Sequence, residues 1–209
     1  TFGLNLDEGN HHISIAAWEW GAYLGEDGME NGIHLGVSSF TRHHANVSMT
    51  KAKITENYAN SVLAKTEAAR NGFDEALMLD PEGFVAECTG ENIFLIKDGV
   101  IFTPPRAVVL EGITRDSLMT IAGDLGYPVI EETISRDQLY IADEVFVCGT
   151  AAEVTPVSRI DHRKIGNGTR GEVTEKIQRV FFETVRGSGQ HSPEWLDYVN
   201  GHQPGVSHG

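Results

Sequence analysis

The sequence is short of cysteine, of positive charge and of long apolar runs. Its two cysteines, Cys88 and Cys148, stand far apart and belong to no CxxC pair, which argues against a disulfide framework and favours a reducing compartment. Sixteen lysines and arginines face thirty acidic residues, and the net charge of −14 argues against a nucleic-acid surface or an anionic membrane. No apolar run is long enough to span a bilayer, and no stretch has the pattern of a signal peptide. We therefore expect a cytoplasmic protein that binds neither nucleic acid nor membrane.

The length of the chain fits one large domain, alone or with a fragment beside it. With 209 residues, of which 40% are hydrophobic, the chain can bury a sizeable core. It begins at Thr1 without an initiator methionine, and its opening is typical of the end of a domain, so we expect a chain that is incomplete at the N-terminus. The predicted divisions are the tail of a small domain over 1–20, an interdomain loop over 21–32, a large domain over 33–199 and a loose tail over 200–209.

Apolar patterns predict an α/β domain from residue 33 onward. Asp98-Gly99 between two β-type runs is the signal of a two-residue hairpin, and Gly72 and Gly187 follow helical patterns as C-terminal caps. The predicted strands cover 13–16, 33–40, 76–79, 93–96, 100–103, 130–134 and 145–148, and the predicted helices cover 57–71, 114–125 and 173–185. The apolar spacing of the first of these helices comes from Tyr58, Val62, Leu63 and Ala69.

Two of the six lysines are candidates for a nucleophilic amine. Such a lysine must be partly desolvated so that its amine is neutral. Lys65 falls on the polar face of a predicted helix and Lys97 beside the hairpin turn, and the lysines at 164 and 176 have charged surroundings. Lys51 and Lys53 remain, in an otherwise uncharged segment between a strand and a helix. The residues alone leave both open, and an ordinary solvated role is the more frequent one for any single lysine.

The carboxylate of Glu87 is a second candidate functional group. It stands between apolar residues at 84–85 and at 93–94. A carboxylate in such surroundings can keep a pyridine nitrogen protonated, so that the ring accepts electrons. The alternative is a strand glutamate that faces solvent or accepts a structural hydrogen bond. Glu91, four positions on, is expected to hold a turn.

Two turns of small residues are candidates for binding an anion. Gly112-Ile113-Thr114 precedes a predicted helix, whose free N–H groups and dipole attract anions, although simple capping by Thr114 is the more frequent use of such a residue. The segment 149–152 follows a buried strand, and it either lets a ligand approach the backbone or is a plain turn. An amine, a carboxylate and two such turns are together what pyridoxal phosphate requires, and their joint occurrence predicts that cofactor.

The nine histidines predict no metal site. The adjacent pairs His11-His12 and His43-His44 point in different directions on a strand or a helix, and no spacing joins them to the cysteines as ligands. We expect no metal.

At these residues the chain resembles the fold-type IV pyridoxal-phosphate enzymes, and within them the branched-chain amino-acid aminotransferases. The resemblance runs from about Ile15 to Val199. It implies an α/β (α+β) large domain of the D-amino acid aminotransferase-like type, a mixed sheet or pseudo-barrel with flanking helices. The motifs that carry it lie at 20–25 (WGAYLG), 57–58 (NY), 87–94 (ECTGENIF), 102–105 (FTPP), 112–116 (GITRD), 142–146 (ADEVF), 149–157 (GTAAEVTPV) and 194–197 (EWLD).

The resemblance also implies roles around the cofactor. It makes Lys53, and not Lys51, the Schiff-base lysine. It places Tyr58 at the phenolic oxygen of the cofactor and Glu87 at the pyridine nitrogen. The residues implied to bind the phosphate are Ile113, Thr114 and Thr150.

Further residues are implied to contact the substrate. The backbone amides of Ala151 and Ala152 would receive its carboxylate, and Tyr23 would close the pocket. One departure from the family is Glu56, which stands where members usually have a small residue, and we expect its carboxylate near Lys53. Members also carry an N-terminal domain of which this sequence holds only the tail.

The activity implied is reversible transfer of an amino group between leucine, isoleucine or valine and 2-oxoglutarate, so the expected partners are small amino acids and 2-oxo acids. We also expect a homo-oligomer, either a dimer or a hexamer. Two alternatives share the fold, a D-amino-acid aminotransferase and an aminodeoxychorismate lyase. A third is a non-catalytic module that keeps the fold without turnover.

Overall fold

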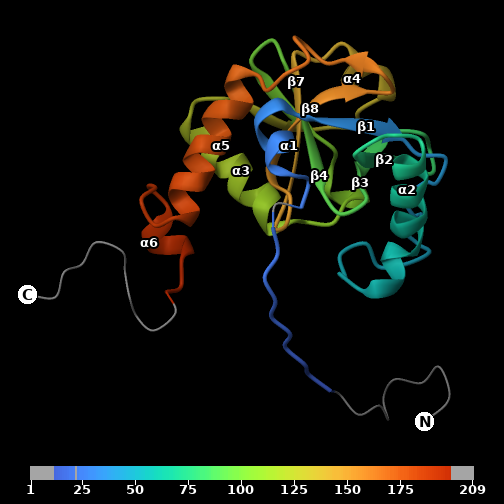
Figure 1. Cartoon of the computed structure of the whole chain (residues 1–209), viewed down its shortest axis with the longest axis horizontal. Coiled ribbons are helices and arrows are strands. Elements are labelled where there is room, and N and C mark those ends of the chain that lie inside the picture. The colour runs from blue at the N-terminus through green and yellow to red at the C-terminus, as the bar shows by residue number, and fades with distance from the viewer. Residues whose placement is uncertain (1–11, 22, 199–209) are drawn as a thin grey trace, which may run out of the picture.

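The computed structural model describes residues 12–21 and 23–198 (Figure 1). None of the helices in this part of the chain is long and apolar enough to cross a membrane. In chain order, the elements are α1 (Glu26–Asn31), β1 (Ile33–Val37), η1 (Thr55–Tyr58), α2 (Ala59–Arg70), β2 (Glu75–Leu79), β3 (Val85–Cys88), β4 (Asn92–Lys97), β5 (Val100–Thr103), η2 (Arg106–Val108), α3 (Ile113–Asp124), β6 (Val129–Glu131), α4 (Arg136–Tyr140), β7 (Glu144–Gly149), β8 (Glu153–Ile160), β9 (Arg163–Lys164), α5 (Glu172–Val185) and α6 (Ser192–Trp195).

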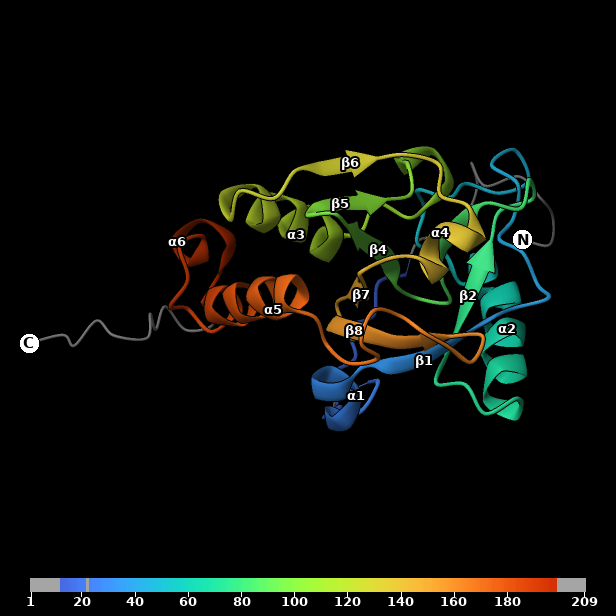
Figure 2. The ribbon, with the colours of Figure 1, turned by 90° about the horizontal axis from the view of Figure 1, so that it is seen from above.

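The strands of the described residues form one mixed sheet in the order β3-β2-β1-β8-β7-β4-β5-β6, with β9 paired to β8. β1 runs parallel to β2 and β8, and β5 parallel to β6, while the other pairs are antiparallel. A turn at 89–91 joins β3 directly to β4, with the Cys88 amide 2.8 Å from the Glu91 carbonyl oxygen. The two ends of the six-strand path β3 to β4 therefore meet, and Figure 2 shows the resulting curl. The predicted mixed sheet or pseudo-barrel with flanking helices is confirmed.

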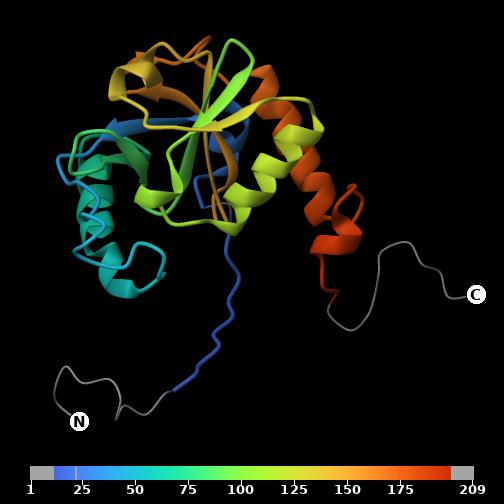
Figure 3. The ribbon, with the colours of Figure 1, turned by 180° about the vertical axis from the view of Figure 1, so that it is seen from behind.

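Three apolar clusters hold the elements together. The first fills the inside of the curled strands and includes Leu35, Leu77 and Val147, all fully buried. The second lies between the sheet and helices α3 and α5, where Phe94 and Phe146 stack with ring centroids 4.9 Å apart. The third packs α2 on β2. Figures 1 and 3 show the result, with α2 beside one end of the sheet and α3 and α5 beside the other. Because burying one large aliphatic side chain is worth about 1.5–3 kcal/mol, these clusters are the main favourable term for the fold.

The elements with strong local signals are confirmed. The hairpin of β4 and β5 turns at Asp98 and Gly99, which have φ angles of 51° and 78° as a tight turn of that kind requires. Helices α3 and α5 and strand β7 match their predicted spans within two residues. Gly72 and Gly187 follow their helices with φ of 79° and 90°, the left-handed conformation that glycine allows.

The predicted strand at 13–16 is wrong. Residues 12–20 have no regular structure, and Ile13 and Ile15 are 92% and 94% exposed. The stretch leaves the body of the domain, so its alternating side chains meet no sheet (Figure 3). The predicted interdomain loop at 21–32 contains the short helix α1, which packs against β8. Residues 1–11 of the predicted tail at 1–20, and the whole predicted tail at 200–209, lie outside the described residues.

The predicted apolar face of the helix at 57–71 is also wrong. Val62 and Leu63 are 64% and 48% exposed, and Ala69 is exposed as well. The buried positions of α2 are Ser61, Ala64 and Ala68, which pack on Ala76 and Met78 of β2. These small side chains let the helix lie close to the strand. A search for large apolar residues at helical spacing does not identify such a face. The strand predicted at 130–134 is shorter than expected, since β6 ends at Glu131.

Candidate active site

A cavity of about 270 Å³ opens where the ends of β3 and β7 and the start of β4 meet the start of α3. The loop before η1 closes its remaining side. The cavity brings together the six residues predicted to hold the cofactor, which come from five separate segments. These are Lys53, Tyr58, Glu87, Ile113, Thr114 and Thr150.

The two candidate lysines differ in what they contact. The Lys51 ammonium forms an ion pair with the Glu111 carboxylate at 2.9 Å and donates hydrogen bonds to the carbonyl oxygens of Arg106 and Val109. Among the described residues, none makes a hydrogen bond or an ion pair with the Lys53 ammonium. Lys53 also lines a second cavity, whereas Lys51 does not. The Lys51 amine is thus engaged in contacts with the protein, whereas Lys53 lines both cavities. Lys53 is exposed, and the expected partial desolvation is absent in this structure.

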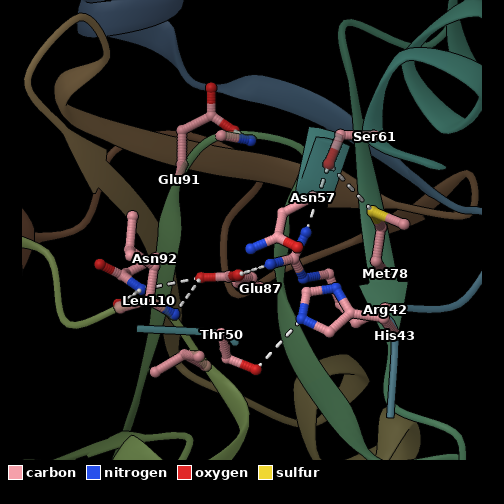
Figure 4. Close-up of polar contacts among 12 residues, drawn as sticks. Arg42, His43, Thr50, Asn57, Ser61, Met78, Glu87, Glu91, Asn92 and Leu110 are labelled. Carbon is pink, nitrogen blue, oxygen red and sulfur yellow. Dashed lines mark hydrogen bonds and ion pairs between the residues drawn. The ribbon is translucent and has the colours of Figure 1, made fainter. Parts of the chain in front are cut away.

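Glu87 is buried at the end of β3, and both of its carboxylate oxygens are occupied (Figure 4). Oε1 lies 2.7 Å from Nη2 of Arg42. Oε2 accepts hydrogen bonds from the Asn92 side chain at 3.1 Å and from the Leu110 amide at 3.2 Å. The alternative of a solvent-facing glutamate is thereby excluded.

Burial raises the pKa of Glu87 to about 7, although the positive charge of Arg42 and the Leu110 hydrogen bond lower it. A carboxyl group with a pKa in this range can exchange its proton near neutral pH. It faces the cavity that Lys53 also lines. A buried carboxylate and a cationic ring nitrogen would stabilise each other there, because each supplies the charge that the other needs.

The N-terminus of α3 offers free backbone donors to the cavity. Its N-cap is Gly112 and no side chain caps the helix, so the alternative of simple capping by Thr114 is excluded. Thr114 is buried, while the Ile113 side chain is 85% exposed and leaves only its backbone for binding. Gly112 has no room for a side chain, since an added Cβ would collide with Oδ1 of Asn92. Uncapped N–H groups at the positive end of a twelve-residue helix can bind an anion.

A second cavity of about 630 Å³ adjoins the first and shares Lys53, Tyr58 and Thr150 with it. The three residues predicted to contact the substrate, Tyr23, Ala151 and Ala152, line this second cavity. Tyr23 is 37% exposed, and the Lys65 ammonium lies 5.4 Å from its ring centroid. The first cavity therefore holds the Glu87 carboxylate and the N-terminus of α3, and the second cavity holds Tyr23, Ala151 and Ala152. Lys53 lines both cavities.

Glu91 lies on the wall between the two cavities and is buried. One of its oxygens accepts the Gly90 amide hydrogen at 3.1 Å, and its carbonyl accepts the Cys88 amide, which agrees with the predicted turn role. Burial and the nearby Glu75 carboxylate raise the pKa of Glu91 to about 8. At neutral pH this carboxyl group is therefore mostly protonated.

Three residues of the site are not predicted from the sequence. Asn92 lies within the motif at 87–94, but nothing in the sequence around it indicates that it contacts Gly112. Leu110 contributes a backbone amide, which no residue type reveals. Arg42 is a single charged residue after a strand, without a pattern around it. Glu56, the departure from the family, lies in the short helix η1, is exposed and lines neither of the two cavities.

Known proteins share this arrangement. The model of the family described as amino-transferase class IV matches residues 2–160. The chain belongs to this family. The chain is 56% identical to the branched-chain-amino-acid aminotransferase of Pseudomonas aeruginosa over 188 residues, which cover 90% of this chain and 61% of that protein. It thus spans about 61% of the length of this curated relative.

Solved structures of class IV relatives carry cofactor derivatives. The crystal structure of the T.th. branched-chain amino acid aminotransferase with pyridoxamine 5'-phosphate is 56% identical and superposes with a TM-score of 0.84, over 88% of this chain and 60% of that one. A structure of the same T.th. enzyme complexed with N-(5'-phosphopyridoxyl)-L-glutamate superposes with a TM-score of 0.79 at 56% identity, over 81% of this chain and 57% of that one.

Proposed function

We propose that the protein is a pyridoxal-phosphate-dependent transaminase that moves the amino group of leucine, isoleucine or valine to 2-oxoglutarate. The observation that carries this proposal is the meeting of Lys53, Glu87 and the uncapped start of α3 around one cavity. Support comes from relatives at 56% identity that are named for this activity, one of which carries pyridoxamine phosphate.

The residues around the cavity fit this cofactor. The N–H groups at the start of α3 and the hydroxyls of Thr114 and Thr150 would bind its phosphate. Glu87 would hold the pyridine nitrogen in its protonated form, and Tyr58 would donate a hydrogen bond to the phenolic oxygen. Residues 33–199 would form the cofactor-binding domain, with 21–32 as the connecting segment.

When bound, the cofactor supplies an aldehyde that takes up the amino group and a ring that accepts electrons from the substrate. Lys53 would hold the cofactor covalently and then carry the proton between the substrate Cα and the cofactor C4′ as a general base and acid. This role is supported by the position of Lys53, which lines both the cavity proposed for the cofactor and the cavity proposed for the substrate.

The second cavity would take the substrate. The backbone amides of Ala151 and Ala152 would receive the substrate carboxylate, and Tyr23 would close the cavity over it. The glutamate adduct in the T.th. enzyme supports 2-oxoglutarate as the acceptor.

We also propose that the protein works as a homo-oligomer, a dimer or a hexamer, in the cytoplasm. The loop that leads to Lys53 exposes Val47 and Met49 by 76% and 77%, an apolar surface that a second subunit could cover. The two buried free thiols, Cys88 and Cys148, suit a reducing compartment. Light scattering after size-exclusion chromatography measures the oligomer, and a monomer would contradict this part.

The activity is tested with purified protein reconstituted with pyridoxal phosphate. A panel of L- and D-amino acids is offered, and the loss of visible absorbance and the 2-oxo acid released are followed for each. We expect L-leucine, L-isoleucine and L-valine to be converted to their 2-oxo acids and the corresponding D-amino acids not to react. A preference for D-amino acids would favour the D-amino-acid aminotransferase alternative, and absence of a visible band would favour a non-catalytic module.

A further inference from the structure

Arg42 is the direct ionic partner of Glu87, and both side chains are almost completely buried, with 8% and 7% exposed. The Arg42 amide donates to the Leu79 carbonyl oxygen at 2.8 Å, which fixes its backbone beside β2. Its guanidinium reaches Oε1 of Glu87 at 2.7 Å and Oγ of Ser61 in α2 at 3.4 Å (Figure 4). The Arg42 side chain therefore links α2 to the end of β3, while its backbone amide ties it to β2.

The arrangement favours the charged form of Glu87. All three donors to its carboxylate, from Arg42, Asn92 and Leu110, are N–H groups, and an ionised carboxylate accepts all of them. Nε of Arg42 is buried and has no hydrogen-bond partner among the described residues. A buried guanidinium with an unpaired nitrogen is costly unless a carboxylate compensates its charge. The pair is therefore built around the ionised carboxylate.

The other groups near Glu87 cannot replace Arg42. Lys51 is half exposed and paired with Glu111, and Arg115 is buried but paired with Glu131 at 3.1 Å. Without a direct cation, burial favours a neutral Glu87. The charged or titratable groups near Glu87 are Arg42, Lys51, Lys53, Arg115 and Glu91, and Cys88 follows it in β3.

We infer that Arg42 is a positioning residue that keeps Glu87 ionised and aimed into the cofactor cavity, so that its carboxylate can hold a protonated pyridine nitrogen. This inference rests on the proposed function for the identity of the ring, but its ionisation step concerns the protein alone. Arg42 acts through Glu87, whose carboxylate it contacts directly. A cofactor bound against a neutral Glu87 would lose its ionic partner.

The first experiment measures the ionisation of Glu87 without cofactor. Infrared spectra at pH 8 compare the wild-type protein with Arg42→Met, Arg42→Lys and the double variant Arg42→Met/Glu87→Gln. We expect Arg42→Met to gain a protonated-carboxyl band that the double variant lacks and that Arg42→Lys shows only weakly. The double variant assigns the band to Glu87 and separates it from Glu91. Arg136→Met is the matched control, because it removes a guanidinium paired at 2.5 Å with Asp161 in another part of the fold.

The second experiment measures the dissociation constant of pyridoxal phosphate, with thermal unfolding of each variant to confirm folding. Loss of about one pKa unit of ionic stabilisation is a tenfold effect, so we expect Arg42→Met to weaken binding at least about tenfold and Arg42→Lys to restore part of it. On the Glu87→Gln background the Arg42→Met change should add little, because the two residues act as one unit. Arg136→Met should bind as the wild type does.

Two outcomes would overturn the inference. One is an Arg42→Met protein that unfolds at a lower temperature, shows no new protonated-carboxyl band and keeps the wild-type affinity for pyridoxal phosphate. A purely structural ion pair predicts this result. The other is full additivity of the two substitutions in binding. A wild-type protein that binds no pyridoxal phosphate would instead contradict the proposed function, while the infrared comparison would still decide the ionisation of Glu87.

Discussion

The Lys51 ammonium lies 2.9 Å from the Glu111 carboxylate, and this ion pair distinguishes two lysines that stand only two positions apart. With its further bonds to two backbone carbonyl oxygens, Lys51 holds the loop to the segment before α3. Lys53 is left at the junction of the two cavities. The same short segment thus supplies a structural lysine and a lysine available for chemistry.

Glu87→Gln should still bind pyridoxal phosphate but react slowly. A neutral amide cannot hold the pyridine nitrogen as a cation, so the ring accepts electrons less well. We expect the half-reaction with leucine to slow by roughly a hundredfold or more, in the range typical for loss of a proton-transfer contribution. Stopped-flow absorbance measures it. An unchanged rate would assign Glu87 a structural role and leave Glu91 as the carboxyl group to test.

Gly112→Ala should weaken cofactor binding. The new methyl group would displace Asn92, whose side chain also donates to Glu87 and to the Leu110 carbonyl oxygen. The substitution therefore disturbs the anion site and the carboxylate together. Gly123→Ala in the same helix is the matched control, since its exposed position has open space and should gain up to about 1 kcal/mol of stability. Equal affinity for pyridoxal phosphate in the two variants would contradict this account of the α3 terminus.

Glu91→Gln should remove a pH dependence of stability. The pKa of Glu91 is about 8 in the folded protein, against the ordinary value of 4.5 that applies to the unfolded chain. Between pH 4.5 and pH 8 the folded state therefore keeps a proton that the unfolded chain has released. Wild-type stability therefore falls as the pH rises from about 4.5 to 8.

We expect the cofactor-free Glu91→Gln protein to resemble the wild type at pH 5 and to be more stable at pH 8.5, by at least ~1.4 kcal/mol if one pKa unit of the shift is expressed. Urea unfolding at the two pH values measures the difference. Glu82→Gln makes the same chemical change at an exposed turn and serves as the control. Parallel stability curves for wild type and Glu91→Gln would contradict the prediction.

Local signals predicted part of the fold. The Asp98-Gly99 turn, the glycine after α5 and the continuous apolar run of β7 each fix structure within a few residues. By contrast, β8 and β3 have no clear sequence pattern. The strand character of β8 comes from β1 and β7 on its two sides, and that of β3 from its antiparallel pairing with β2. The buried face of α2 is not predictable from large apolar residues, because it consists of small ones. Ala64 and Ala68 each bury little area, but their small size lets the helix pack on β2.

The site was predictable where chemistry is tied to residue type or to a family motif. Lys53, Glu87 and Thr114 were named from the sequence, and the structure places them around one cavity. Arg42 was not, because a lone arginine has no periodicity and its partner lies 45 positions away. The residues alone leave Lys51 and Lys53 open, and the family resemblance selects Lys53. The ion pair of Lys51 with Glu111, which only the folded loop brings into contact, is an independent difference between the two lysines.

The central claim is that Lys53 carries the cofactor, and trapping tests it directly. The protein is incubated with pyridoxal phosphate, reduced with borohydride and digested, and fragment-ion mass spectrometry locates the modified lysine. Lys51→Ala and Lys53→Ala proteins are treated in parallel, and both should fold, because each change removes an exposed amine and no core volume. We predict modification at Lys53 in the wild type and in Lys51→Ala, and none in this segment of Lys53→Ala. Modification at Lys51, or a visible cofactor band that survives in Lys53→Ala, would contradict the account.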